Sequence, residues 1–397
     1  MTESVKPLSG VADREVDTLV VGGGIGGLAS ALAIVRTGRS VHVVEQAPAF
    51  SEIGAGLQIG PNASAAMQRL GVLKHVAAEA VTPRTAVMRD AVTGTEITSL
   101  DLGPAFRDRY RFPYLVVHRN DVLGALLDAC RQEPLLTLET GRQARSVHAS
   151  GSGTVVAFAD GSTIGAQLVV GADGLRSVIR KTIADDEPVY SGYTAFRGTV
   201  PTSAVRSDVP MDDVVLWIGA GMHLMQYPVR NKQVYNQVAV VRRPVSEDGP
   251  PAPGFLAETF AGAHPAVLQS VSLIATERDW PLFDRDPIDR WVRDGVVLVG
   301  DAAHPMLQYL GQGAGQALED AVVLADCLER SADRDTALAS YEAKRVTRGT
   351  RCQRSARPWG ELWHTDDPLV LALRRRVLGG QDPSDYSELD WLYASQV

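Results

Sequence analysis

The chain has 397 residues, of which 45% are hydrophobic and 22% are charged, so it is long enough for two or three globular domains. Its net charge is -8 at pH 7 and its basic residues are scattered, which argues against a nucleic-acid partner. No stretch approaches the roughly 20 apolar residues that cross a bilayer, and the N-terminus lacks the apolar core of a signal peptide. Three widely spaced cysteines predict neither disulfides nor a metal site. We therefore expect a cytoplasmic protein without a membrane span or a metal.

The first predicted element is an apolar strand at residues 17–21, which leads directly into a glycine-rich turn. Gly22, Gly24 and Gly27 have the G-x-G-x-x-G spacing of a dinucleotide-binding turn. Such glycines allow a tight turn, close approach of a pyrophosphate, and close packing of the next helix on the strand. The run GGLASALAIVRTGR then predicts the crossover helix of a βαβ unit, which ends at Gly38. The alternative interpretation is a glycine turn with a purely structural role.

Glu45 follows the second predicted strand, residues 40–44, roughly 20 residues after the last glycine of the turn. An acid at this position of a βαβ unit binds the ribose hydroxyls of an adenosine. The order of strand, turn, helix, strand and acid therefore predicts a dinucleotide site. It fits NAD as well as FAD.

Two further apolar strands are predicted at residues 166–170 and 295–300. All four strands are apolar throughout rather than alternating, as parallel strands covered on both faces are, so we expect them to share one sheet. Asp173 follows the third strand in the segment GADGLRSVIR. It is a second acid at a strand end, and its alternative role is that of a helix-capping aspartate.

The stretch GDAAHPMLQYLGQGAGQALED, residues 300–320, favours FAD over NAD. Asp301 stands at the carboxyl end of the fourth strand, and Gly311, Gly313 and Gly315 open a helix shortly afterwards. An exposed acid at a strand end suits the hydroxyls of a polyol, and a helix N-terminus offers free N–H groups and partial positive charge to an electron-rich ring edge. A ribityl chain leading to an isoalloxazine has this arrangement of groups. We therefore predict FAD.

Between the third and fourth strands, segments such as DVVLWIGA, MHLMQYPV and YNQVAVVRRP predict an inserted antiparallel sheet, with a surface loop at residues 242–254. The expected fold class is α/β, with a Rossmann-like FAD-binding domain, an inserted antiparallel-sheet substrate domain and a helical C-terminus. The expected FAD-binding domain is discontinuous and comprises residues 1–80, 102–185 and 280–345. The substrate-binding sheet comprises residues 81–101 and 186–279, and the C-terminal helical segment comprises residues 346–397.

With these residues in view, the chain resembles the single-component FAD-dependent aromatic hydroxylases, the family of para-hydroxybenzoate and salicylate hydroxylases. The resemblance rests on the N-terminal glycine turn, on GADGLRSVIR and on GDAAHP, which together span nearly the whole chain. It implies FAD as cofactor, NADH or NADPH as co-substrate, O₂, a small aromatic acid as substrate, and a homodimer. It also places EIGAGLQIGPNA, residues 52–63, beneath the flavin. The FAD contacts that it implies are Gly22, Gly24, Gly26, Gly27, Glu45, Arg119, Asp301, Gly313 and Ala314.

The segments SGYTAFRGT, MHLMQYPV, NQVAV, LQYL and WGELWH are similar to the 3-hydroxybenzoate 6-hydroxylase branch of this family. By this resemblance, His223 and Gln308 are the catalytic residues, and Tyr227 and Tyr114 line the substrate pocket. Salicylate hydroxylases usually carry proline in place of Gln308, and a glutamine can both donate and accept a hydrogen bond to a phenol. His223, with a reference pKa near 6.5, can take the phenolic proton and so raise the electron density ortho and para to the oxygen.

The resulting hypothesis is hydroxylation of 3-hydroxybenzoate para to its hydroxyl, which gives gentisate. Another phenolic acid, such as salicylate or an aminohydroxybenzoate, is the alternative substrate. A plain NAD-dependent dehydrogenase fits the first 45 residues but leaves GDAAHP unexplained, and a non-catalytic flavin-fold binding protein is a third reading. From the residues alone, a histidine in a strand is more often structural, a loop glutamine often bonds nearby backbone, and tyrosines in an inserted sheet are core by default.

Overall fold

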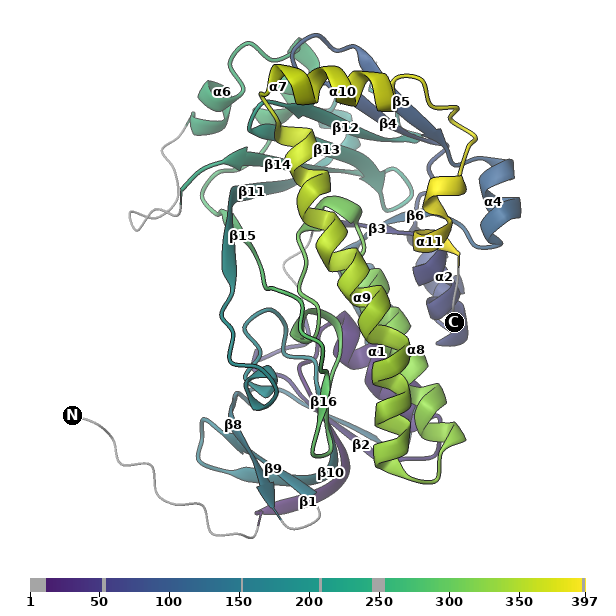
Figure 1. Cartoon of the computed structure of the whole chain (residues 1–397), viewed down its shortest axis with the longest axis vertical. Coiled ribbons are helices and arrows are strands. Elements are labelled where there is room, and N and C mark those ends of the chain that lie inside the picture. The colour runs from purple at the N-terminus through teal and green to yellow at the C-terminus, as the bar shows by residue number, and fades with distance from the viewer. Residues whose placement is uncertain (1–11, 52–54, 151–152, 207–208, 245–253, 395–396) are drawn as a thin grey trace, which may run out of the picture.

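The computed structural model describes residues 12–51, 55–150, 153–206, 209–244, 254–394 and 397. Two sheets lie at opposite ends of an elongated molecule, and one long helix runs along both (Figure 1). Part of the expected loop at 242–254 and part of the segment 52–63 lie outside the described residues.

The first sheet has the strand order β16-β17-β10-β1-β2-β7, in which β17, β10, β1, β2 and β7 run parallel. All four predicted strands pair in it, as expected from their unbroken apolar character. β9 adds an antiparallel pair to β10, and β8 pairs with β9. The bounds are β1 Arg14–Val21, β2 Val41–Val44, β7 Leu136–Glu139, β8 Ala144–Ser150, β9 Gly153–Phe158, β10 Thr163–Gly171, β16 Val292–Arg293 and β17 Val296–Leu298.

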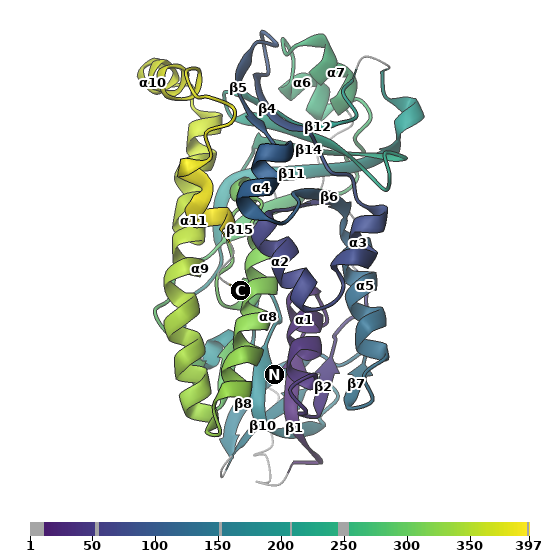
Figure 2. The ribbon, with the colours of Figure 1, turned by 90° about the vertical axis from the view of Figure 1, so that its right-hand side faces the viewer.

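Helices cover this sheet and carry its loops. The predicted crossover helix is α1, Ile25–Val35, and Gly38 after it has φ +90°. α1 packs against α8, Gly313–Arg330, so closely that a Cβ on Gly26 would lie 3.2 Å from the Cβ of Ala317. α5, Arg119–Arg131, packs on the same layer (Figure 2). Tight helix packing here brings the N-termini of α1 and α8 toward one region.

The second sheet has the order β15-β11-β14-β13-β12-β4-β5 and is antiparallel except where β12 pairs with β4. Short helices α6, Phe255–Thr259, and α7, Pro265–Val271, pack on one face, where they share an apolar cluster with Leu224 and Phe196. The other face looks toward the first domain (Figure 1). The strands are β4 Thr85–Asp90, β5 Glu96–Asp101, β11 Val189–Pro201, β12 Asp213–Gly219, β13 Met222–Val229, β14 Val234–Arg242 and β15 Trp280–Asp284.

Two expected domain boundaries differ from the limits of the sheets and helices in the structure. β15 pairs with β11 through Ala195 and Trp280, so the second sheet extends past residue 279, because WPLFD supplies an edge strand rather than a connector. The expected boundary at residue 345 falls inside α9, Arg334–His364. Asp333 caps this 31-residue helix and Pro358 lies inside it without ending it, so one helix joins both sheet regions.

The remaining elements connect the two sheets. The two-stranded sheet of β3, Gly56–Ile59, and β6, Leu115–His118, lies between them, beside α2, Pro61–Arg69, and α3, Leu73–Glu79 (Figure 2). α4, Pro104–Tyr110, and the C-terminal α10, Pro368–Leu378, and α11, Asp390–Tyr393, complete the helices. Among the described residues, no helix combines the length and the apolar character needed to cross a membrane.

Candidate active site

The glycine turn after β1 has the tight geometry that its spacing predicts. Gly22 has φ +110°, and a Cβ on it would collide with the carbonyl oxygen of Ala172 behind the neighbouring strand β10. A Cβ on Gly27 would collide with the carbonyl oxygen of Gly22. Gly24 is the N-cap of α1, so the free amides of the first helical turn open directly onto the turn. The backbone can therefore approach a phosphate group closely at this position.

Glu45 lies at the end of β2, on the same sheet edge as the glycine turn. Its carboxylate accepts hydrogen bonds from the amides of Gly23, at 2.7 Å, and Ala47, at 2.8 Å. Because the side chain is only half-buried, its remaining lone pairs are accessible. The structure thus brings the predicted acid and the predicted turn together.

Asp301 lies in the 3-10 turn Gly300–Ala302 behind β17. One of its carboxylate oxygens is 3.8 Å from the place where a Cβ on Gly313 would stand, so it faces the N-terminus of α8, where Ala314 also lies. The side chain reaches water on one side and is surrounded by protein on the others, and this burial raises its pKa, against the charges of His304 and Arg119. Burial lowers the pKa of Arg119, and the charge of Asp301 opposes that shift. The two residues are therefore close enough for their opposite charges to attract.

Asp173 is a capping residue, the alternative that the sequence left open. Its carboxylate accepts hydrogen bonds from Ser177 Oγ at 2.5 Å and from the amides of Val178 and Ile179 at 2.7 and 3.1 Å. These bonds begin the 3-10 helix Ile179–Thr182. The acid is therefore engaged by its own loop.

Arg180 belongs to that same motif, and its role was missed from the sequence. The buried guanidinium donates to the carbonyls of Ala302, at 2.9 Å, and Ala303, at 2.7 Å, and pairs with Asp186. It thus holds the backbone next to Asp301. The residues of GADGLRSVIR gave no indication of this contact, because its partners lie in a distant segment of the chain.

A second buried network supports α8 from behind. Glu319 and Asp320 are fully buried and form ion pairs with Arg345 on α9, while Arg348 pairs with Glu319. His304 Nε2 lies 2.6 Å from Asp320, so this histidine joins the loop after β17 to α8.

The inner face of the second sheet carries the predicted catalytic histidine. Register places His223 and Tyr227 of β13 on the face that looks toward the first domain, with Asn236 of β14 opposite Tyr227. Arg197 of β11 lies on the same face, because it pairs with Val238, which in turn pairs with Met225. Burial raises the pKa of Tyr227, and the charge of Arg197 opposes this shift.

Gln308 meets this face from the loop between Asp301 and α8. Its Oε1 accepts a hydrogen bond of 3.3 Å from Arg197 Nη2, and its neighbour Tyr309 has its ring 5.8 Å from that of His223. His223 itself is 1% exposed, and its Nδ1 lies 2.7 Å from Nε2 of His364 at the end of α9. Sequence analysis missed Arg197 and His364, although both lie in segments that carried the resemblance.

Tyr227 and Tyr114 both meet β3. A Cβ on Gly56 would collide with the Tyr227 ring, and the Gly56 amide donates to Asn236 Oδ1 at 2.6 Å. The Tyr114 hydroxyl donates to Gln58 Oε1 at 2.5 Å. Tyr114 also packs edge to face against Phe106 and Tyr393. The two predicted pocket tyrosines therefore both contact the segment expected beneath the flavin, Tyr227 at Gly56 and Tyr114 at Gln58.

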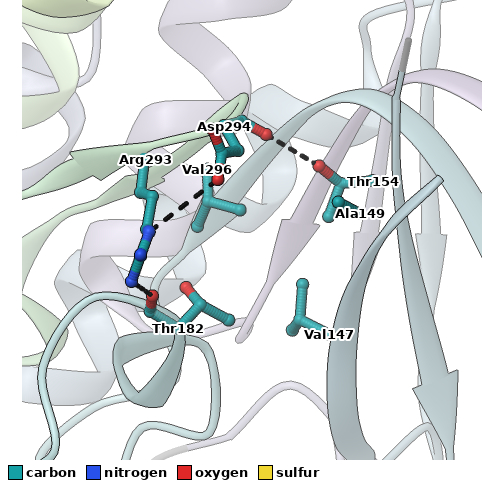
Figure 3. A pocket seen from close by; sticks show the side chains of 7 residues that line it. All are labelled: Val147, Ala149, Thr154, Thr182, Arg293, Asp294 and Val296. Atoms are coloured by element: carbon teal, nitrogen blue, oxygen red, sulfur yellow. Dashed lines mark hydrogen bonds and ion pairs between the residues drawn. The ribbon is translucent and has the colours of Figure 1, made fainter. Parts of the chain in front are cut away.

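A small pocket of about 90 Å³ lies elsewhere, at the far end of the first sheet. Figure 3 shows Arg293 reaching toward the carbonyl of Thr182, at 2.8 Å, and Thr154 donating to the carbonyl of Asp294, at 3.0 Å. The pocket is lined by Val147, Ala149, Thr154, Thr182, Arg293, Asp294 and Val296. None of the predicted site residues lines it, and it is smaller than ordinary ligand pockets of about 300 Å³ or more.

Known proteins resemble this chain in sequence and in fold. A family profile described as a FAD binding domain matches residues 15–356. The chain is 35% identical to the 3-hydroxybenzoate 6-hydroxylase of Klebsiella oxytoca over 380 residues, which cover 94% of this chain and 96% of that protein. It is 36% identical to the 3-amino-4-hydroxybenzoate 2-monooxygenase of Streptomyces cremeus over 385 residues, which cover 96% of each.

The solved structure of Klebsiella pneumoniae HpxO complexed with FAD and uric acid is similar in fold, with a TM-score of 0.83 and 26% identity. The match covers 92% of this chain and 93% of that one. The family profile spans residues 15–356, and the two relatives match 94% and 96% of the chain. The chain belongs to the FAD-dependent aromatic hydroxylases, flavoprotein monooxygenases that use NADH or NADPH as co-substrate.

Proposed function

We propose that this enzyme hydroxylates 3-hydroxybenzoate para to its hydroxyl group and releases gentisate. One observation carries the proposal: the inner sheet face combines a buried imidazole, a phenol and a guanidinium, and the guanidinium holds Gln308. These groups suit a ring that carries both a hydroxyl and a carboxylate. Full-length similarity to the Klebsiella oxytoca 3-hydroxybenzoate 6-hydroxylase supports this substrate.

The first domain has the groups to hold FAD. In our proposal, the Glu45 carboxylate accepts hydrogen bonds from the ribose hydroxyls of the adenosine. The pyrophosphate is approached by the backbone amides of Gly22, Gly24, Gly26 and Gly27. Bound FAD supplies the chemistry that takes two electrons from NADH or NADPH and uses O₂ to oxygenate the aromatic ring.

At the other end of the cofactor, the Asp301 carboxylate accepts hydrogen bonds from the ribityl hydroxyls. Arg119 lies along the pyrophosphate and the ribityl chain. The amides of Gly313 and Ala314 face the ring edge at the N-terminus of α8. The fit rests on three features of the structure: a turn that excludes a Cβ, an accessible acid at its mouth, and an acid facing a helix N-terminus.

His223 is the proposed base for the phenolic proton. Burial, with the neighbouring His364, holds its pKa well below the usual value, so its imidazole is neutral at ordinary pH and has a lone pair for the phenolic proton, while the same burial makes it a weaker base. Gln308 forms a hydrogen bond with the same oxygen of the substrate and so fixes the orientation of the aromatic ring. Removal of the proton raises the electron density para to the oxygen, where the new C–O bond forms.

The carboxylate of the substrate has two candidate partners on the same face. Arg197 Nε and Asn236 Nδ2 are buried and have no hydrogen-bond partner among the described residues. A buried donor without an acceptor costs about 1–3 kcal/mol, which a bound carboxylate would recover. Tyr227 lies beside Asn236, and the Tyr114 hydroxyl bonds Gln58 of β3.

The direct test follows NADH and NADPH oxidation with a panel of mono- and dihydroxybenzoates and identifies each product by mass and retention time. We expect 3-hydroxybenzoate to stimulate oxidation and to yield gentisate. If an isomer does so and 3-hydroxybenzoate does not, the substrate assignment is wrong. His223→Ala and Gln308→Ala should keep bound flavin but divert oxidation into peroxide, whereas His264→Asn, on the opposite face of the sheet, should remain coupled.

An aminohydroxybenzoate is the second candidate substrate. The observation that favours it is the 36% identity to the Streptomyces cremeus 3-amino-4-hydroxybenzoate 2-monooxygenase over equal shares of both chains. The same panel, extended with 3-amino-4-hydroxybenzoate and salicylate, separates these substrates by product structure.

A further inference from the structure

The proposed base is one half of a buried histidine pair. His223 Nδ1 and His364 Nε2 are 2.7 Å apart, and their rings stack with centroids 5.0 Å apart and planes 16° from parallel. Both side chains are about 1% exposed. A hydrogen bond between two neutral imidazoles holds a single proton, so one ring donates and the other accepts. The direction of that bond decides which atom His223 offers to the substrate.

We infer that His364 is a positioning residue, which accepts the hydrogen bond from Nδ1–H of His223 and so leaves a lone pair on His223 Nε2 for the phenol. This inference rests on the proposed function, since it concerns the same phenolic proton. In the opposite arrangement His223 Nε2 would carry a hydrogen and would be unable to act as a base. The tautomer is thus as important as the position of the ring.

The position of His364 is tightly defined. It is the last residue of α9, and its carbonyl accepts a hydrogen bond of 2.9 Å from the Gly221 amide, at the turn that precedes β13. Its ring stacks on Tyr193 with centroids 4.2 Å apart. The edges of Trp363 and Tyr309 enclose the His223 ring at 5.2 and 5.8 Å. The helix end and the strand start are therefore joined by backbone as well as by the imidazoles.

The proton balance needs no additional reactant. The phenolic O–H bond breaks and its proton joins His223 Nε2, while the proton on Nδ1 crosses the 2.7 Å bond to His364 Nε2. The positive charge then resides on His364, and the negative charge on the substrate oxygen. The reverse transfer restores both neutral rings when the product leaves.

Some groups around His364 stabilise a positive charge on its ring, and others destabilise it. The C-terminal end of α9 and the face of the Tyr193 ring favour a cation. Burial and, secondly, the charge of Arg242 lower the pKa of His364 to about 3. The titratable or charged groups around the pair are Tyr193, Tyr309 and Arg242, and Asp366 acts on Arg242. The pair is therefore neutral at rest, and a cation on His364 is a short-lived state that forms only during the proton transfer proposed above.

Two substitutions separate the positioning role from simple packing. His364→Gln places an amide oxygen near the position of Nε2, so it can still accept from His223 but cannot take a proton. His364→Phe keeps a ring against Tyr193 and can do neither. The matched control is His264→Asn, which removes a histidine stacked on Trp217 on the opposite face of the sheet and keeps a capping side chain for α7.

The first measurement is ¹⁵N NMR of the flavoprotein with labelled histidine. We expect His223 to carry its proton on Nδ1 in the wild type and in His364→Gln, and to lose this preference in His364→Phe. A wild-type His223 protonated on Nε2 would overturn the inference. This measurement needs no substrate, so it stands even if the substrate assignment fails.

The second measurement is the pH profile of coupled turnover, using whichever aromatic acid of the panel gives product. Loss of general base catalysis typically costs about 100-fold, so we expect that loss in His364→Phe, about a tenfold loss in His364→Gln, and KM within about twofold. Both losses should shrink as pH rises toward the phenol pKa of about 10, because the substrate then arrives ionised. Equal losses at every pH, with normal melting temperature and flavin content, would assign His364 a merely structural role.

Discussion

Arg180 Nη1 donates a hydrogen bond of 2.7 Å to the carbonyl of Ala303, across 123 residues of chain. The same guanidinium bonds Ala302 and pairs with Asp186. One buried cation therefore joins the loop that Asp173 caps to the loop that presents Asp301. The placement of Asp301 against α8 depends on these interactions of Arg180.

Arg180→Met should destabilise the protein and weaken FAD retention together. Removal of Arg180 leaves the buried carbonyls of Ala302 and Ala303 without this donor, at a cost of about 1–3 kcal/mol each, and takes from Asp186 one of its two arginine partners. Thermal melting and the flavin absorbance after gel filtration check this result. The neighbouring Lys181→Met removes an exposed cation and should leave the melting temperature and the flavin content unchanged. Equal behaviour of the two variants would show that Arg180 does not hold the Asp301 loop.

Gly27→Ala should weaken FAD binding by more than tenfold, which is about 1.4 kcal/mol. The added Cβ collides with the Gly22 carbonyl and forces the turn away from the phosphate position. Fluorescence titration of the apoprotein with FAD measures the affinity. The control is Gly124→Ala, because Gly124 lies in α5 with open space around it and the change should stabilise the helix by up to about 1 kcal/mol. Unchanged FAD affinity in Gly27→Ala would refute the proposed role of the turn.

Asp301→Asn should lower the affinity for FAD by roughly 10- to 100-fold, since charge-assisted hydrogen bonds contribute about 1.5–3 kcal/mol. The change is nearly isosteric, so α8 and its buried ion pairs should remain intact. The same titration, with circular dichroism as the check on folding, measures the effect. Tight binding by Asp301→Asn would mean that this acid does not hold the cofactor.

The stability of the fold should depend on pH through His364. Its pKa is about 3 in the folded protein and near 6.5 in the unfolded chain, so the unfolded chain binds more protons as pH falls below about 6.5. This side chain alone should then reduce the free energy of unfolding by about 2 kcal/mol between pH 7 and about pH 5.

In His364→Gln that part of the acid sensitivity should disappear. Urea unfolding at the two pH values measures the difference, and Trp363→Phe, a non-titrating change beside the pair, serves as the control. The same pH dependence in His364→Gln and the wild type would show that the histidine is not held neutral by the fold.

The cofactor domain was largely predictable because its signals are local. An unbroken apolar run, a glycine spacing and an acid at the next strand end are steric requirements that a short window of sequence records. The structure confirms the shared sheet of the four strands, the helix between Gly24 and Gly38, and the approach of Asp301 to Gly313. The domain limits at residues 279 and 345 were less predictable, because the second sheet takes an edge strand that begins at Trp280 and a long helix continues across residue 345.

What the sequence by itself determined is thus the FAD-binding architecture, since glycine sterics and strand burial are properties of neighbouring residues. Only the tertiary structure decided that Asp173 caps its own loop, that Arg180 supports the Asp301 loop, and that His223 pairs with His364 across 141 residues. These contacts depend on strand register and on where a 31-residue helix ends, and both are set by the packing of distant segments.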